Sequence, residues 1–112
     1  MAYDEDLAHL IRELLGGERG DVTEMKMFGG LAFLLNGHIS VAASHRGGVM
    51  VRVAPAAAAR ALASPHASTI VMRGREMHGW TYVEPDGVKT KRQLAVWVRR
   101  GVEHARSLPA KR

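Results

Sequence analysis

The sequence contains no cysteine, and this absence removes several classes of protein at once. Disulfides, thiolate nucleophiles and cysteine-based zinc or iron–sulfur sites all need that residue, so packing alone must stabilise the fold. Carboxylates are also scarce over most of the chain. The acidic residues after Glu24 are Glu76, Glu84, Asp86 and Glu103. Chemistry that depends on a pair of carboxylates is therefore poorly supported.

Long hydrophobic runs are missing as well, since no apolar stretch approaches the roughly 18 residues of a membrane span. The N-terminal region is acidic at residues 4–6, where a secretory signal would be basic. We therefore expect a cytoplasmic protein that does not enter the membrane. The length of 112 residues, with 46% hydrophobic and 24% charged residues, is typical of one globular domain. We expect a single domain over residues 1–112, with its core at about residues 5–107.

The charges that are present are distributed unevenly. Residues 1–24 contain seven acidic and two basic residues, whereas the rest of the chain contains fourteen basic and four acidic ones. This asymmetry can steer an anionic partner to the basic part or pair two copies of the chain. It is equally compatible with solvated surfaces.

Hydrophobic periodicity predicts the elements. Leucine and isoleucine at positions 7, 10, 11, 14 and 15 follow the spacing of one helix face, which ends at Gly16. A β-rich stretch follows over residues 22–53, with a hairpin turn at Asn36-Gly37. Within it, Val49, Val51 and Val53 face a core, and the intervening Met50 and Arg52 are expected on the outer side.

The second half predicts a short alanine-rich helix over residues 55–63, strands over residues 68–72 and 79–83, and a closing helix that begins after Thr90. Thr90 and Gln93 match a capping box. The predicted order is one helix, three or four strands, a helix, two strands and a helix. Strands grouped by hairpin turns favour an α+β fold in two layers, with a mainly antiparallel sheet and helices on one side.

Two adjacent glycines, Gly29 and Gly30, interrupt the strand pattern after Lys26 and Phe28. Glycine inside a strand marks a bulge, a bend or the close approach of a backbone or a ligand. A bend with packed side chains beneath it is the plainer interpretation. The functional alternative is a small-ligand or nucleotide site formed by Lys26, Phe28, Gly29, Gly30 and Arg52.

Two separated motifs carry a resemblance to a known family. Residues 26–31 read KMFGGL and are followed by an apolar strand, the turn at Asn36-Gly37 and the strand VMVRV at residues 49–53. Residues 93–100 read QLAVWVRR, with a tryptophan and paired arginines. Over about residues 5–107 the chain resembles the N-terminal domain of the TfoX or Sxy competence regulators.

The resemblance implies a two-layer α+β fold without established catalytic residues or cofactors. It also implies a non-enzymatic regulatory domain whose partner is a protein, a transcription regulator among the candidates, and self-association is a further expectation. In the full-length regulators this domain precedes a second one, which this sequence does not contain. The competence role therefore does not follow from the resemblance.

The histidines and serines do not form a recognisable catalytic or metal-binding motif. The histidines stand at positions 9, 38, 45, 66, 78 and 104 without a close ligand pair, so no metal site is expected. His9 and His104 lie beside the apolar stripes of their helices, and we expect both to face solvent. Lys91, Arg92, Arg99 and Arg100 give the closing helix a basic stripe, which is a candidate for weak, non-specific nucleic-acid binding.

Overall fold

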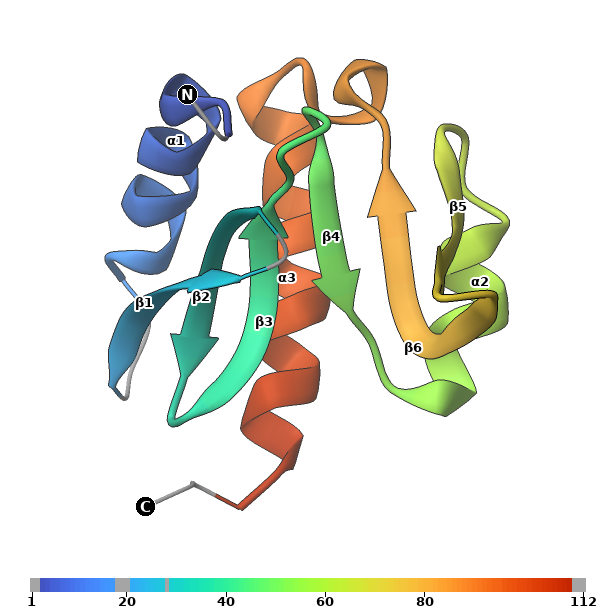
Figure 1. Cartoon of the computed structure of the whole chain (residues 1–112). Coiled ribbons are helices and arrows are strands. Elements are labelled where there is room, and N and C mark those ends of the chain that lie inside the picture. Colours follow the sequence, from blue (N-terminus) through green and yellow to red (C-terminus); the bar gives the residue numbers. More distant parts are fainter. Residues whose placement is uncertain (1–2, 18–20, 28, 110–112) are drawn as a thin grey trace.

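A computed structural model describes residues 3–17, 21–27 and 29–109, and Figure 1 shows the two layers that they form. Within these residues the sheet has six strands in the order β1-β2-β3-β4-β6-β5, and every neighbouring pair is antiparallel. The strands are β1 (Val22–Met27), β2 (Gly30–Leu35), β3 (His38–Ala43), β4 (Val49–Arg52), β5 (Ala67–Met72) and β6 (Arg75–Val83).

The helices lie against one face of this sheet (Figure 1). They are α1 (Glu5–Leu15), α2 (Ala58–Leu62) and α3 (Lys91–Ser107), with 3-10 turns at Pro55–Ala57 and Pro85–Val88. The predicted α+β class, the two layers and the order of the elements are confirmed. The capping box at the start of α3 is confirmed too, because the Thr90 hydroxyl accepts a hydrogen bond from the Gln93 backbone and the Gln93 side chain accepts one from the Thr90 backbone.

The main core lies between the helices and the sheet. Phe33 and Val51 from the sheet are fully buried there, together with Ile11 from α1 and Leu94 from α3. A fully buried side chain of this size contributes about 1.5–3 kcal/mol to stability. Most of the hydrophobic stabilisation therefore comes from this layer, which holds α3 against β3 and β4.

Glycine has a structural role at the two predicted turns. Asn36 and Gly37 have φ angles of 53° and 84°, so the predicted hairpin turn between β2 and β3 is confirmed. The backbone of Gly30 packs directly against the carbonyl group of Ala43 in β3, and a Cβ atom at this position would overlap it. The double glycine therefore permits a close approach of two strands.

One expectation about the strands was wrong, and another was confirmed with a difference in burial. Strand β6 begins at Arg75 rather than at residue 79, because Arg73 and Gly74 form a two-residue turn with φ angles of 52° and 77°. Such turns match the twist of the adjoining strands, so pairing continues up to the turn. Met50 lies on the face opposite the helices, as the alternation predicts, but it is buried, with an exposed fraction of 7%. The face of the sheet that it joins has its own apolar cluster.

No helix in the described part of the chain combines the length and the apolar character that crossing a membrane requires.

Candidate interaction face

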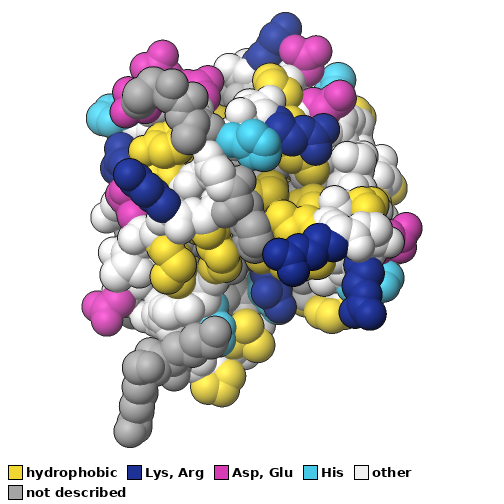
Figure 2. All heavy atoms as spheres, in the orientation of Figure 1, with side chains coloured by type: hydrophobic (Ala, Val, Ile, Leu, Met, Phe, Trp, Pro, Cys, Tyr) yellow, Lys and Arg dark blue, Asp and Glu magenta, His cyan; other side chains and the backbone are white. Residues whose placement is uncertain are grey.

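The face of the sheet opposite the helices carries a second apolar cluster, here called the open face. No helix among the described residues lies over it, and Figure 2 looks onto it, with hydrophobic side chains gathered at its centre. Its buried members are Ala32, Leu34, Ala42, Met50, Trp80 and Tyr82, and Met27, Ile39, Ile70 and Met77 pack against them. A sheet in a two-layer domain usually keeps such a face polar. The apolar cluster on the open face is therefore not a requirement of the two-layer fold.

Strand alternation places these side chains. In β4, Val49 and Val51 point to the helices, so Met50 and Arg52 point to the open face. Arg52 is paired in register with Trp80 of β6, and Met50 is paired with Tyr82. Directly paired residues have neighbouring side chains on the same face. The central rows of the open face thus combine a methionine, an arginine and two aromatic rings.

Methionine is concentrated on this face. Every methionine after the N-terminal residue contributes to the open face or to the hollows beside it: Met25, Met27, Met50, Met72 and Met77. Met25 is the most accessible of them whose exposure is given, with an exposed fraction of 50%. Methionine is flexible and polarisable, and it is enriched at surfaces that adapt to a binding partner. Its placement suits contact with another molecule.

Two arginines cover the aromatic rings. The guanidinium carbon of Arg46 lies 4.7 Å from the centre of the Tyr82 ring, and that of Arg52 lies 5.5 Å from the centre of the Trp80 ring. The Tyr82 hydroxyl donates a hydrogen bond of 2.9 Å to the backbone carbonyl of Gly47. Cation–π contact keeps each guanidinium group close to the surface while its charge remains available to a partner.

Two hollows flank the arginines. One, with a volume of about 320 Å³, is lined by Met50, Met72, Tyr82 and Arg46 among others. The second, of about 420 Å³, includes Met25 and Arg52 and extends to the end of α3. Among the described residues that form the open face or line these hollows, none is acidic. The face is therefore apolar and positively charged.

His104 reaches the second hollow from α3, and the expectation that it faces solvent was wrong. It is half-buried, and its Nδ1 atom is buried without a hydrogen-bond partner among the residues that the structure describes. Burial lowers the pKa of His104, and the nearby charges of Arg52 and His38 lower it further. Helix periodicity placed His104 beside the apolar stripe, but the ends of β3 and β4 that surround it come from distant segments. Sequence patterns contain no signal for that environment.

The structure does not bring the predicted ligand-site residues together. Lys26 is paired with Leu31, whose side chain belongs to the core under the helices, so Lys26 and Arg52 point to opposite faces of the sheet. Gly29 lies against the His45 side chain, and Gly30 lies against the backbone of Ala43. The predicted residue Phe28 lies outside the described residues. Of this set, only Arg52 belongs to the open face.

The predicted basic stripe on α3 is also divided. Lys91 turns toward α1, where its Nζ atom lies 3.9 Å from a carboxylate oxygen of Glu13. Arg92 and Arg99 are exposed, whereas Arg100 is half-buried and stacks on Trp97 at 4.5 Å from the ring centre. The aromatic residues Trp80 and Tyr82 lie on the open face, on the other side of the sheet from α3. The four basic residues therefore do not form one surface.

A resident metal ion has no candidate site in the part of the chain that the structure describes, because no three histidine or carboxylate side chains gather there.

A comparison with known protein families identifies the family of this chain. Residues 13–105 match the family model of the TfoX N-terminal domain, which covers most of the chain. The chain belongs to the TfoX N-terminal domain family. No curated protein and no solved structure is a significant match. Family membership confirms the resemblance that the two sequence motifs indicated. Both motifs are part of the secondary structure of this TfoX-type domain. The double glycine joins β1 to β2, and QLAVWVRR lies within α3.

Proposed function

We propose that this TfoX-type domain is a non-enzymatic, cytoplasmic regulatory domain that acts by binding a protein partner through the open face. The observation that carries the proposal is the composition of that face. It contains methionine, tryptophan, tyrosine and arginine, of which Met25 is half exposed while Trp80 and Tyr82 are largely buried, and lysine and the acidic residues are missing from its described members. This is the composition that distinguishes the centre of protein interfaces from the rest of a protein surface.

The chemistry of the face restricts the partner. Arg46 and Arg52 carry two positive charges over an apolar surface, and no described carboxylate of the face neutralises them. A complementary partner therefore presents apolar side chains flanked by carboxylates. A transcription regulator with such a surface is the partner that we propose, consistent with membership of the TfoX N-terminal domain family. A second copy of the chain is the alternative occupant.

The proposal that the domain is not an enzyme rests on its residues. The sequence offers no thiol, no recognisable grouping of nucleophile, base and acid, and few carboxylates after Glu24. The regulatory role needs none of these groups, because a binding domain acts through the free energy of its interface.

Site-specific photocrosslinking tests which face meets the partner. A photoreactive amino acid at position 25 places the probe on the open face, and the matched control at Val96 places it on α3, where the exposed fraction is 45%. Both variants are expressed with a candidate transcription regulator. We expect crosslinking to the regulator from position 25 and not from position 96.

The affinity of the purified domain for the purified regulator then tests the role of the charges on Arg46 and Arg52. Reversal of both arginines in Arg46→Glu plus Arg52→Glu should weaken binding at least about tenfold, because each variant side chain repels a carboxylate. Arg92→Glu, an exposed substitution on α3, should leave the Kd within about twofold. Crosslinks only between copies of the chain, or equal losses in both variants, would overturn the proposal.

A further inference from the structure

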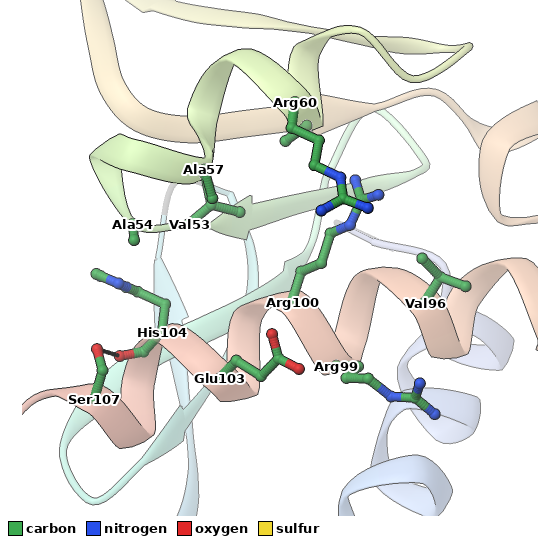
Figure 3. A pocket seen from close by; sticks show the side chains of 11 residues that line it. Val53, Ala54, Ala57, Arg60, Val96, Arg99, Arg100, Glu103, His104 and Ser107 are labelled. Atoms are coloured by element: carbon green, nitrogen blue, oxygen red, sulfur yellow. Dashed lines mark hydrogen bonds between the residues drawn. The ribbon is translucent and has the colours of Figure 1, made fainter.

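A groove on the helical side of the molecule gathers arginines that the sequence does not place together. It runs between α3 and the segment formed by the 3-10 turn and α2, and its volume is about 390 Å³ (Figure 3). Val53, Ala57 and Ala61 give it an apolar floor. The volume lies near the lower end of the range for small-molecule sites, about 300–1,000 Å³. A small organic molecule therefore fits it better than an extended polymer.

Arg60 and Arg100 enter this groove from opposite sides, Arg60 from α2 and Arg100 from α3. Figure 3 shows their guanidinium groups turned toward one another, and both residues line the groove. Neither forms an ion pair with a described carboxylate. Two like charges held in one groove repel each other unless an anion lies between them. The described lining of the groove contains three arginines, Arg60, Arg99 and Arg100, and one acidic residue, Glu103, so the groove carries an excess of positive charge.

Arg100 is already held in position for such a role. Its guanidinium carbon lies 4.5 Å from the centre of the Trp97 ring, and its Nη1 atom lies 3.3 Å from the Ser64 hydroxyl oxygen. Arg60 is exposed and free to adjust. A partly fixed guanidinium group loses less conformational entropy when it binds, and the planar fork of arginine matches the oxygens of a phosphate group.

We propose that this groove binds a small phosphorylated molecule, with the phosphate between Arg60 and Arg100 and the organic part on the apolar floor. A phosphate ester carries a charge of about −1.5 to −2 at pH 7, which two guanidinium groups neutralise. A single carboxylate carries half as much. The groove lies on the helical side of the sheet, and His104 is the one described residue that lines both this groove and the second hollow of the open face.

A substitution of Glu103 distinguishes the binding of a phosphate from the binding of a neutral molecule. Among the described residues that line the groove, Glu103 is the one acidic residue, and it lies on the same helix as Arg100 (Figure 3). A carboxylate near a bound phosphate weakens binding by repulsion. Glu103→Gln should therefore tighten the binding of phosphates, whereas it would leave the binding of a neutral molecule unchanged.

Calorimetric titration at low ionic strength with phenyl phosphate, inorganic phosphate and phenol as probes tests the site. We expect saturable binding of phenyl phosphate with a Kd below about 1 mM, weaker binding of inorganic phosphate and no binding of phenol. Arg60→Gln and Arg100→Gln should each weaken phenyl phosphate at least about tenfold, because each removes charge-assisted hydrogen bonds. Arg73→Gln, on the exposed β5–β6 turn, is the matched control and should have little effect.

Arg60→Gln keeps the test decisive if Arg100→Gln disturbs the packing of Trp97, because Arg60 is exposed. The NMR signals of the Arg60 and Arg100 side-chain Nε–H groups should shift on titration with phenyl phosphate. Absence of saturable phosphate binding at 10 mM ligand, or an unchanged Kd in Arg60→Gln, would overturn the proposal. Tighter binding of duplex DNA that is lost in Arg92→Gln, a position outside the groove, but kept in Arg60→Gln would overturn it too.

Discussion

The backbone of Gly30 lies directly against the carbonyl oxygen of Ala43, where β2 begins and β3 ends. Any side chain at position 30 would have to push two paired strands apart, because the obstructing atom belongs to the backbone and cannot rotate away. The double glycine of the family motif is thus a packing requirement of the sheet in this chain.

Gly30→Ala should lower the free energy of unfolding by about 3 kcal/mol, the upper part of the range for overpacking substitutions. Gly17→Ala is the matched control, because a Cβ atom there would meet nothing within 4 Å. Urea unfolding followed by circular dichroism measures both. Equal stabilities for the two variants would show that the strands separate without cost at this point.

Loss of the α3 capping box should destabilise the fold measurably. The Thr90 hydroxyl oxygen accepts a hydrogen bond of 3.1 Å from the Gln93 backbone N–H, which would otherwise have no partner within the helix. Thr90→Ala should lower the free energy of unfolding by about 1 kcal/mol, and Thr90→Ser should retain most of it. Thermal unfolding distinguishes the two, and an equal loss in both would contradict the role of the hydroxyl.

His104 should make the stability depend on pH in the mildly acidic range. Its pKa in the folded state is below the ordinary value of 6.5, so the unfolded chain takes up a proton at a pH where the folded protein does not. The free energy of unfolding should therefore fall as the pH drops below about 6.5, until the folded-state pKa is reached.

His104→Gln tests this dependence by removing the titrating group. The difference in unfolding free energy between pH 7.5 and pH 5.5 should be smaller in this variant than in the unaltered protein. His9→Gln, an exposed histidine of α1, is the control and should keep the full difference. An unchanged difference in His104→Gln would assign the effect to other groups.

The ion pair between Arg12 of α1 and Glu24 of β1 should make the stability depend on pH in a more acidic range. Arg12 donates hydrogen bonds of 2.6 Å and 2.8 Å to the two carboxylate oxygens of Glu24, and these bonds lower the pKa of Glu24 from its ordinary value of 4.5. A carboxylate with a lowered pKa contributes stability above about pH 4.5, and the contribution disappears as the pH falls through the folded-state value.

Glu24→Gln should therefore reduce stability at pH 7 slightly and flatten its decline between pH 5 and pH 3. The effect is small because both side chains are substantially exposed, and surface pairs of this kind contribute little. Glu76→Gln, an exposed substitution on β6, is the control. The same flattening in the control would contradict a specific role for the pair.

Local sequence patterns predicted much of the fold because they depend on neighbouring residues. The spacing of apolar residues placed α1 and α3, and Asn36-Gly37 placed the β2–β3 turn, since positive φ angles are a local requirement. Strand β6 was predicted too short, because its first residues are polar and its pairing with β5 follows from the turn at Arg73 and Gly74.

The candidate sites were less predictable, because they depend on contacts between residues that are distant in the sequence. Alternation in β4 separated Val51 from Met50 and Arg52, but it did not indicate that the second face would be apolar. That property depends on Trp80 and Tyr82, which reach β4 only because β6 lies next to it in the sheet. Sequence spacing likewise did not indicate that Lys26 and Arg52 point to opposite faces.

The sequence by itself determined the class of the fold, the family and most of the elements, because helix and strand periodicity and turn chemistry act over a few neighbouring residues. Only the tertiary structure decided which charges meet. Arg60 and Arg100 share a groove, and Arg52 covers Trp80, because packing of helices and strands brings distant segments together. Long-range contacts of this kind leave no periodic signal in the chain, so the arginine-lined groove and the open face became visible only in the folded domain.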